Sequence, residues 1–272
     1  MQFRSWAPPT RPWRGLIACT AAVLMLAACA TSSEPRHDVW MKLVRWLSVD
    51  TSVTPVKTTM MGPHLQISVR TPPVAGDDAQ AAVVLAGARA AMVRFRDVQA
   101  AERDGYKAYI TQGQIGEEVH YTHFWRAGSE KTRIDPERPS SLLYRRTADG
   151  MKIVGVMYTA KPDAAPEELN RRVPLSIGTW HRHVHFCGWP SDAPRHDYEG
   201  PAPRFGFYGS IADEATCKAA RGYWIPVAFG WMTHVYPEGK THEDRWFGRQ
   251  MIAAEAGLPS SYNCMSTASE EP

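Results

Sequence analysis

One stretch of the chain, 179–189, has a histidine at every second position, and this spacing constrains its conformation more than any other feature does. Successive side chains of a β-strand point to opposite faces. In a strand, His181, His183 and His185 would therefore share one face with Cys187. The other face would be mostly apolar, with Trp180, Arg182, Val184 and Phe186. This alternation predicts a β-strand with metal-binding side chains along one side.

The predicted metal ligands begin with His181 and His183, because imidazoles two positions apart on a strand can reach one ion. Zinc and copper both accept histidine nitrogen as a donor. Further ligands are expected from neighbouring strands, and His234 and His120 lie in strand-like contexts. The competing interpretation is a row of histidines on a solvated face that binds no metal.

Two glutamates, Glu117 and Glu118, precede His120. Either carboxylate could accept a hydrogen bond from a ligand histidine or act as a base on a metal-bound water. The His-x-His pair resembles the arrangement in carbonic anhydrases and in cupins, which implies a metal completed from a neighbouring strand. Cupins also carry a glutamate shortly after the pair, where this chain has Gly188, Trp189 and Pro190.

The N-terminus has the pattern of an exported protein. Three arginines precede an apolar run at 15–26, which is too short to span a membrane as a mature helix. The run leads into the sequence LAAC, ending at Cys29, which resembles the lipobox of bacterial lipoproteins. This resemblance implies removal of a 1–28 leader and lipidation of Cys29; Ala30 fits sorting to the outer membrane, facing the periplasm. An ordinary secretory signal is the alternative.

The charge of the expected mature chain is balanced. The leader holds three of the 31 Lys and Arg residues and none of the 28 Asp and Glu residues, so the two kinds become equal. This balance argues against a nucleic-acid partner. We expect a tether at 29–38, a single globular domain at 39–265 and a disordered tail at 266–272.

The five cysteines predict one disulfide. Cys19 would leave with the leader and Cys29 would carry the lipid. Among Cys187, Cys217 and Cys264, an oxidising periplasm favours one pair, and Cys187 with Cys217 is the preferred one. A Cys187 in a disulfide cannot also be a thiolate ligand.

The apolar periodicity predicts an α+β fold. A spacing of three and four residues predicts a long helix at 78–104, with a break near Asp97 as the alternative, and another helix at 241–256. Alternating patterns predict strands near 65–70, 117–125, 141–146, 151–159, 176–187 and 225–236. The expected architecture is a mostly antiparallel sheet with a long N-terminal helix and short C-terminal helices.

Two motifs anchor a wider resemblance, to a family of uncharacterised secreted bacterial proteins. They are WHRH at 180–183 and FGWMTHVYP at 229–237. The resemblance extends over most of the mature chain. It implies a single domain and brings no established activity.

The expected function is that of a lipid-anchored periplasmic protein that binds copper or zinc through His181, His183, His234 and His120. Three histidines and an open position would permit metal-dependent hydrolysis or redox chemistry, whereas four ligands suggest storage or a structural role. The alternative is a metal-free envelope lipoprotein that acts as a structural, ligand-binding or protein-binding module. The membrane, reached through the lipid, is the one partner that the sequence predicts.

Overall fold

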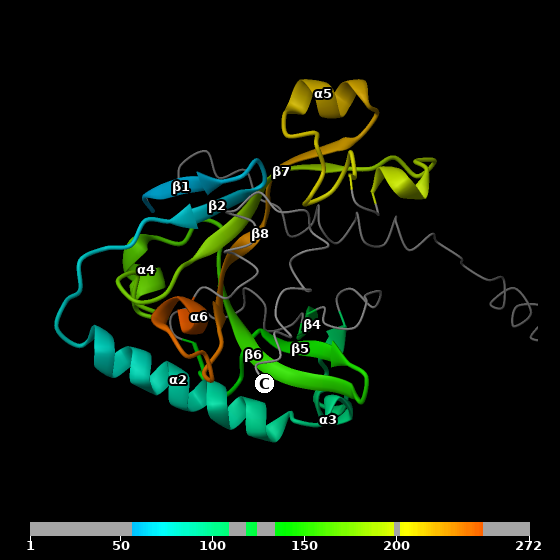
Figure 1. The fold of residues 1–272 in the computed structure, drawn as a ribbon. Helices are drawn as coiled ribbons and strands as arrows, with labels where there is room; N and C mark the ends of the chain where they lie inside the picture. The colour runs from blue at the N-terminus through cyan, green and yellow to red at the C-terminus, as the bar shows by residue number, and fades with distance from the viewer. Residues whose placement is uncertain (1–55, 109–117, 124–133, 199–201, 247–272) are drawn as a thin grey trace, which may run out of the picture.

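The computed structural model describes residues 56–108, 118–123, 134–198 and 202–246. One eight-stranded sheet dominates these ranges, in the order β1-β2-β7-β8-β6-β5-β4-β3, and every neighbouring pair is antiparallel (Figure 1). The strands are β1 (Thr58–Met61), β2 (Leu65–Ser68), β3 (Lys107–Ala108), β4 (Glu118–Thr122), β5 (Ser141–Thr147), β6 (Gly150–Ala160), β7 (His181–Gly188) and β8 (Tyr223–Val235).

The helices of the described ranges are short, with one exception. The exception is α2 (Asp77–Arg94), which has 18 residues. The others are α3 (Val98–Arg103), α4 (Pro166–Asn170), the 3-10 turn η1 (Arg195–Asp197), α5 (Glu214–Ala219) and α6 (His242–Trp246). Among the described residues, no helix combines the length and apolar character that a membrane span requires.

The predicted α+β fold class is wrong. The described part of the chain is mostly sheet, and its helices other than α2 have no more than six residues. The long helix is also not N-terminal, because α2 follows β1 and β2. Cross-strand pairing between distant segments therefore decides this fold, and helical periodicity along the chain is a weaker influence.

The predicted helix at 78–104 is interrupted. α2 ends before Phe95, and Asp97 adopts an extended backbone conformation in which its carboxylate accepts the N–H of Gln99 and caps α3. The apolar spacing continues across this break, so periodicity alone suggests one helix. Of the predicted helix at 241–256, α6 covers 242–246, and the remainder lies outside the described residues. The predicted leader, tether and tail also lie outside them.

One face of the sheet forms the main hydrophobic core. α2 packs against β6, and small residues on its inner side, such as Ala88 and Ala91, allow a close approach (Figure 1). The sheet supplies large buried side chains to this core: Leu142, Tyr144, Tyr158, Trp180 and Trp231. The burial of these apolar side chains provides the main driving force for folding.

A second, smaller core lies at the far end of β7. Cys187 and Cys217, the pair favoured from the sequence, form a disulfide with a Cα–Cα distance of 5.7 Å. Phe205 and Ile211 are buried beside this bond. The disulfide thus attaches α5 and the preceding segment to the end of β7, beyond the part of the sheet that α2 covers (Figure 1).

Candidate functional site

The predicted metal ligands lie on the sheet face that points away from α2. Val235 belongs to the main core, so its neighbour on β8, His234, points to the other side. In the strand register, His234 is opposite Met157 of β6, and His181 is opposite Met232 of β8. Residues directly opposite in antiparallel strands share a face. Met232 and His234 are two residues apart on β8, so their side chains point to the same side. His181, which is opposite Met232, therefore lies on the same face as His234.

Four histidine rings lie next to one another on this face, and we call them the histidine cluster: His120, His181, His183 and His234. The ring centroids of His120 and His234 are 5.3 Å apart, those of His234 and His181 are 4.9 Å apart, and those of His181 and His183 are 5.9 Å apart. Each contact is edge-to-face. The four ligands predicted from the sequence thus come together from β4, β7 and β8.

The third histidine of the alternating row, His185, lies outside the cluster. Its φ of 56° is in the left-handed region, so the regular alternation of β7 ends there. The His185 ring stacks on Trp224 at 5.9 Å, and its Nδ1 lies 3.0 Å from the carbonyl oxygen of Pro63. As a consequence, the ring of Phe207 contacts both His183 and Phe186, which the sequence placed on opposite faces.

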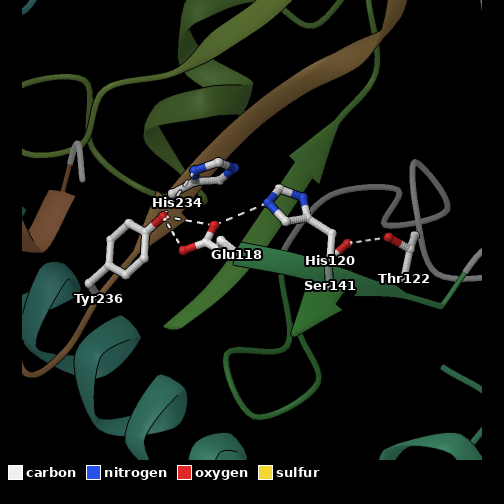
Figure 2. A network of polar contacts seen from close by, with 6 residues as sticks. All are labelled: Glu118, His120, Thr122, Ser141, His234 and Tyr236. Carbon is white, nitrogen blue, oxygen red and sulfur yellow. Dashed lines mark hydrogen bonds and ion pairs between the residues drawn. The ribbon is translucent and has the colours of Figure 1, made fainter. Parts of the chain in front are cut away.

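A buried carboxylate adjoins the cluster. The side chain of Glu118 is only 3% exposed, and its Oε1 lies 3.1 Å from Nε2 of His120, where it accepts a hydrogen bond (Figure 2). A neutral imidazole that donates through one nitrogen keeps a lone pair on the other. Since Nε2 of His120 donates to Glu118, Nδ1 keeps the lone pair and is the atom that could bind a metal. Glu117, the other carboxylate considered, lies outside the described residues.

Tyr236, which follows β8, completes this network and had not been singled out from the sequence. Its hydroxyl donates to Glu118, with both carboxylate oxygens at 3.1 Å, and lies 3.4 Å from Nδ1 of His234 (Figure 2). Gly155 makes room for the ring, because a Cβ there would lie 2.7 Å from Cδ1 of Tyr236. The only sequence signal for Tyr236 was its position in the 229–237 motif, and Gly155 had none.

The environment keeps three of the clustered imidazoles, those of His181, His183 and His234, neutral. Burial, followed by the charges of His183 and His120, lowers the pKa of His181 well below its ordinary value of 6.5. Burial, followed by the charges of His181 and His120, lowers the pKa of His234 well below the same value. Burial, followed by the charges of His120 and His64, lowers the pKa of His183 to about 4. At neutral pH these rings therefore carry lone pairs that could bind a metal.

Glu118 remains ionised in the same environment. Burial alone would raise the pKa of its carboxyl, but the hydrogen bond and charge of His120 act against this effect. The charge of His234 and the hydrogen bond from Tyr236 act in the same direction, and the pKa is lowered overall. The site therefore combines neutral nitrogen donors with one negative charge.

The spacing of the rings fits a shared metal ion. Two imidazoles bound to one tetrahedral ion at about 2 Å would have ring centroids about 5 Å apart. The observed separations of 4.9–5.9 Å bracket this value. Among the described residues, no three His, Cys, Asp or Glu side chains are already placed so that they could hold an ion. Because the rings contact edge-to-face, binding would require them to rotate so that their nitrogens converge.

Comparison of the chain with models of protein families, with curated proteins and with solved structures finds no match. The resemblance to secreted bacterial proteins therefore stays a prediction, as do the lipidation of Cys29 and the outer-membrane location. Both Cys29 and Cys264 lie outside the described residues. His123, three residues after His120, contacts the ring of Tyr106 and does not belong to the cluster.

Proposed function

We propose that the protein binds a transition metal ion through the histidine cluster, at the surface of a membrane to which a lipid on Cys29 attaches it. The observation that carries the metal proposal is the spacing of neighbouring imidazole rings in the cluster, 4.9–5.9 Å in three pairs, which is close to the spacing of two imidazoles bound to one tetrahedral ion. Copper and zinc are the ions that a set of nitrogen donors favours. The location in the envelope rests on the lipobox-like sequence before Cys29.

The polar network supports the proposal, because metal-binding histidines commonly donate their second N–H to a carboxylate or another oxygen. His120 makes this contact with Glu118, and His234 makes a longer one with the Tyr236 hydroxyl. In both cases one ring nitrogen makes a hydrogen bond, and the other nitrogen could bind the metal. Such contacts select which ring nitrogen carries the hydrogen and which one keeps the lone pair.

The ligand number would decide the chemistry of the site. His181, His183 and His234 as ligands would leave one position open for a water or substrate, whereas adding His120 would fill a tetrahedral shell. His120 is partly accessible, with 26% of its side chain exposed, and it is held by Glu118. A three-histidine site with His120 beside its open position would suit metal-dependent hydrolysis or redox chemistry.

Elemental analysis tests the metal proposal directly. The full chain is produced in a bacterial host without a His tag, purified in detergent, exposed to copper or zinc and desalted. We expect about one bound ion per chain in the parent protein. A His181→Ala/His183→Ala double variant should retain none.

His185→Asn provides the matched control, because it removes an imidazole from the same strand but outside the cluster. Asparagine tolerates the left-handed conformation at this position. The control should bind as the parent does. A folded parent that retains neither metal would refute the metal proposal and favour the alternative, a metal-free envelope lipoprotein that binds a ligand or a protein.

A further inference from the structure

Two methionines lie directly beside the histidine cluster in the strand register. Met232 of β8 is opposite His181, and Met157 of β6 is opposite His234. Side chains in directly opposite positions have Cβ atoms about 5 Å apart and point to the same face. The sequence analysis assigned neither methionine a role.

These two methionines could form the buried base of the metal site. Met157 is 6% exposed and Met232 is 7% exposed, and both belong to a small apolar cluster with Leu143. Leu143 is in turn opposite His120 in the register of β4 and β5. Three of the four clustered histidines thus have one of these buried apolar side chains as their cross-strand neighbour.

A methionine thioether is a soft, neutral donor. Thioether and thiolate sulfur favour Cu(I), whereas carboxylate and water oxygen favour harder ions. Methionine also fills irregular gaps in apolar cores, so its presence alone says little. What distinguishes Met157 and Met232 is that each is paired, across adjacent strands, with a different histidine of one cluster.

We propose that the metal of the histidine cluster is copper in its monovalent state, with the thioether sulfurs of Met157 and Met232 as additional donors. This inference rests on the proposed metal-binding function and gives it a definite metal and two further ligand candidates. It assigns the chain to the handling of Cu(I) and makes zinc-dependent hydrolysis the less favoured chemistry.

Competition titrations test the inference. The metal-free full chain in detergent is titrated anaerobically with Cu(I) against a chromogenic chelator, and separately with Zn²⁺. We expect the parent to bind Cu(I) more tightly than Zn²⁺. A Met157→Leu/Met232→Leu double variant should lose at least about tenfold in Cu(I) affinity and change by less than about threefold in Zn²⁺ affinity. Leucine has nearly the volume of methionine, so the core should tolerate the exchange.

Met92→Leu is the matched control, because Met92 belongs to α2 and packs against the main core, on the opposite side of the sheet from the histidine cluster. It should leave both affinities unchanged. X-ray absorption of the copper-loaded parent provides a measurement that needs no variant, and we expect sulfur as well as nitrogen neighbours.

The outcomes separate this inference from the metal proposal. Binding of Zn²⁺ in preference to Cu(I), unchanged Cu(I) affinity in the double variant, or copper with nitrogen neighbours alone would overturn the inference and leave the metal site intact. Binding of neither ion, or binding that survives His181→Ala/His183→Ala, would overturn both.

Discussion

The two faces of the sheet share the same strands but satisfy their buried polar groups in different ways. On the face beneath α2, two large buried side chains donate hydrogen bonds to backbone carbonyls: Trp180 donates to Val173, and Tyr144 donates to Phe95. On the other face, four imidazoles contact one another and a carboxylate. The first arrangement holds the fold together, whereas the second concentrates titratable groups at mutual electrostatic cost.

This difference indicates that the histidine cluster contributes less to stability than the helix-covered core does. A buried polar cluster stabilises a protein only when each member is satisfied, and interacting imidazoles of lowered pKa disfavour protonation of one another. Such an arrangement is typical of a functional site. The two faces should therefore respond differently to substitution, to acid and to metal.

The largest contrast should appear when each face is truncated. Trp180→Ala removes a fully buried indole from the helix-covered core and should lower the free energy of unfolding by about 3–5 kcal/mol. His183→Ala on the other face should lower it by about 1 kcal/mol in the metal-free protein. Denaturant titration monitored by circular dichroism measures both. Equal losses would show that the two faces contribute alike.

A fall in pH should destabilise the metal-free protein through the buried histidines of the cluster. Between pH 6.5 and about 4, the unfolded chain would bind protons at His181, His183 and His234, whereas the folded chain would not. The free energy of unfolding of the metal-free protein should therefore fall with pH, by up to about 1.4 kcal/mol per unit for each histidine.

The Glu118 carboxylate, with a lowered pKa, should add a loss of the same sign below pH 4.5, its ordinary value. Denaturant titrations at several pH values measure the slope. The conservative core variant Trp180→Phe should keep it, and His181→Leu/His234→Leu should flatten it. Stability that stays constant from pH 6.5 to 4 would contradict the assignment of neutral buried imidazoles.

At the metal site, Glu118→Gln should change the affinity for the metal. Loss of the charge that orients His120 should weaken metal binding by about 10–100-fold, a typical effect of removing such a hydrogen-bonded carboxylate. Glu137→Gln is the control, since this exposed carboxylate pairs with Arg94 outside the site. Calorimetric titration with Zn²⁺ or Cu(I) measures the affinity. If both variants bind alike, Glu118 does not orient a ligand.

The smallest effect should come from a single hydroxyl. Tyr236→Phe removes the donor to Glu118 and should weaken metal binding by about 1 kcal/mol, or roughly fivefold. Tyr158→Phe removes a comparable hydrogen bond, to Pro136, on the helix-covered face. It should lower stability by a similar amount and leave the affinity for metal unchanged. The reverse pattern would assign Tyr236 a purely structural role.

The sequence was most informative where chemistry and alternation coincide. Histidines in strand-like contexts were sufficient to select the four rings that lie together, because a strand fixes which side chains share a face. His185 was left out of the predicted ligands, but the reason for its exclusion could not be foreseen, since a left-handed backbone at a histidine leaves no mark in the residue pattern. The contact that permits Tyr236 to reach Glu118 depends on the absence of a side chain at Gly155, on another strand.

The fold was less accessible than the site. Strand segments are visible as local alternation, but their order in the sheet depends on pairing between segments far apart in the chain, such as β2 with β7. The break before α3 depends on one aspartate that competes for a backbone N–H, while the apolar spacing runs on unchanged. Local patterns therefore overstated the helical content of a chain in which long-range pairing dominates.

The histidine cluster has a consequence for when the protein can acquire a metal. Its members come from β4, β7 and β8, and more than a hundred residues separate His120 from His234 along the chain. A chain that is still extended cannot bring these rings within reach of one ion. Metal binding would therefore report complete assembly of the sheet, and the ion would be taken up in the compartment where folding ends.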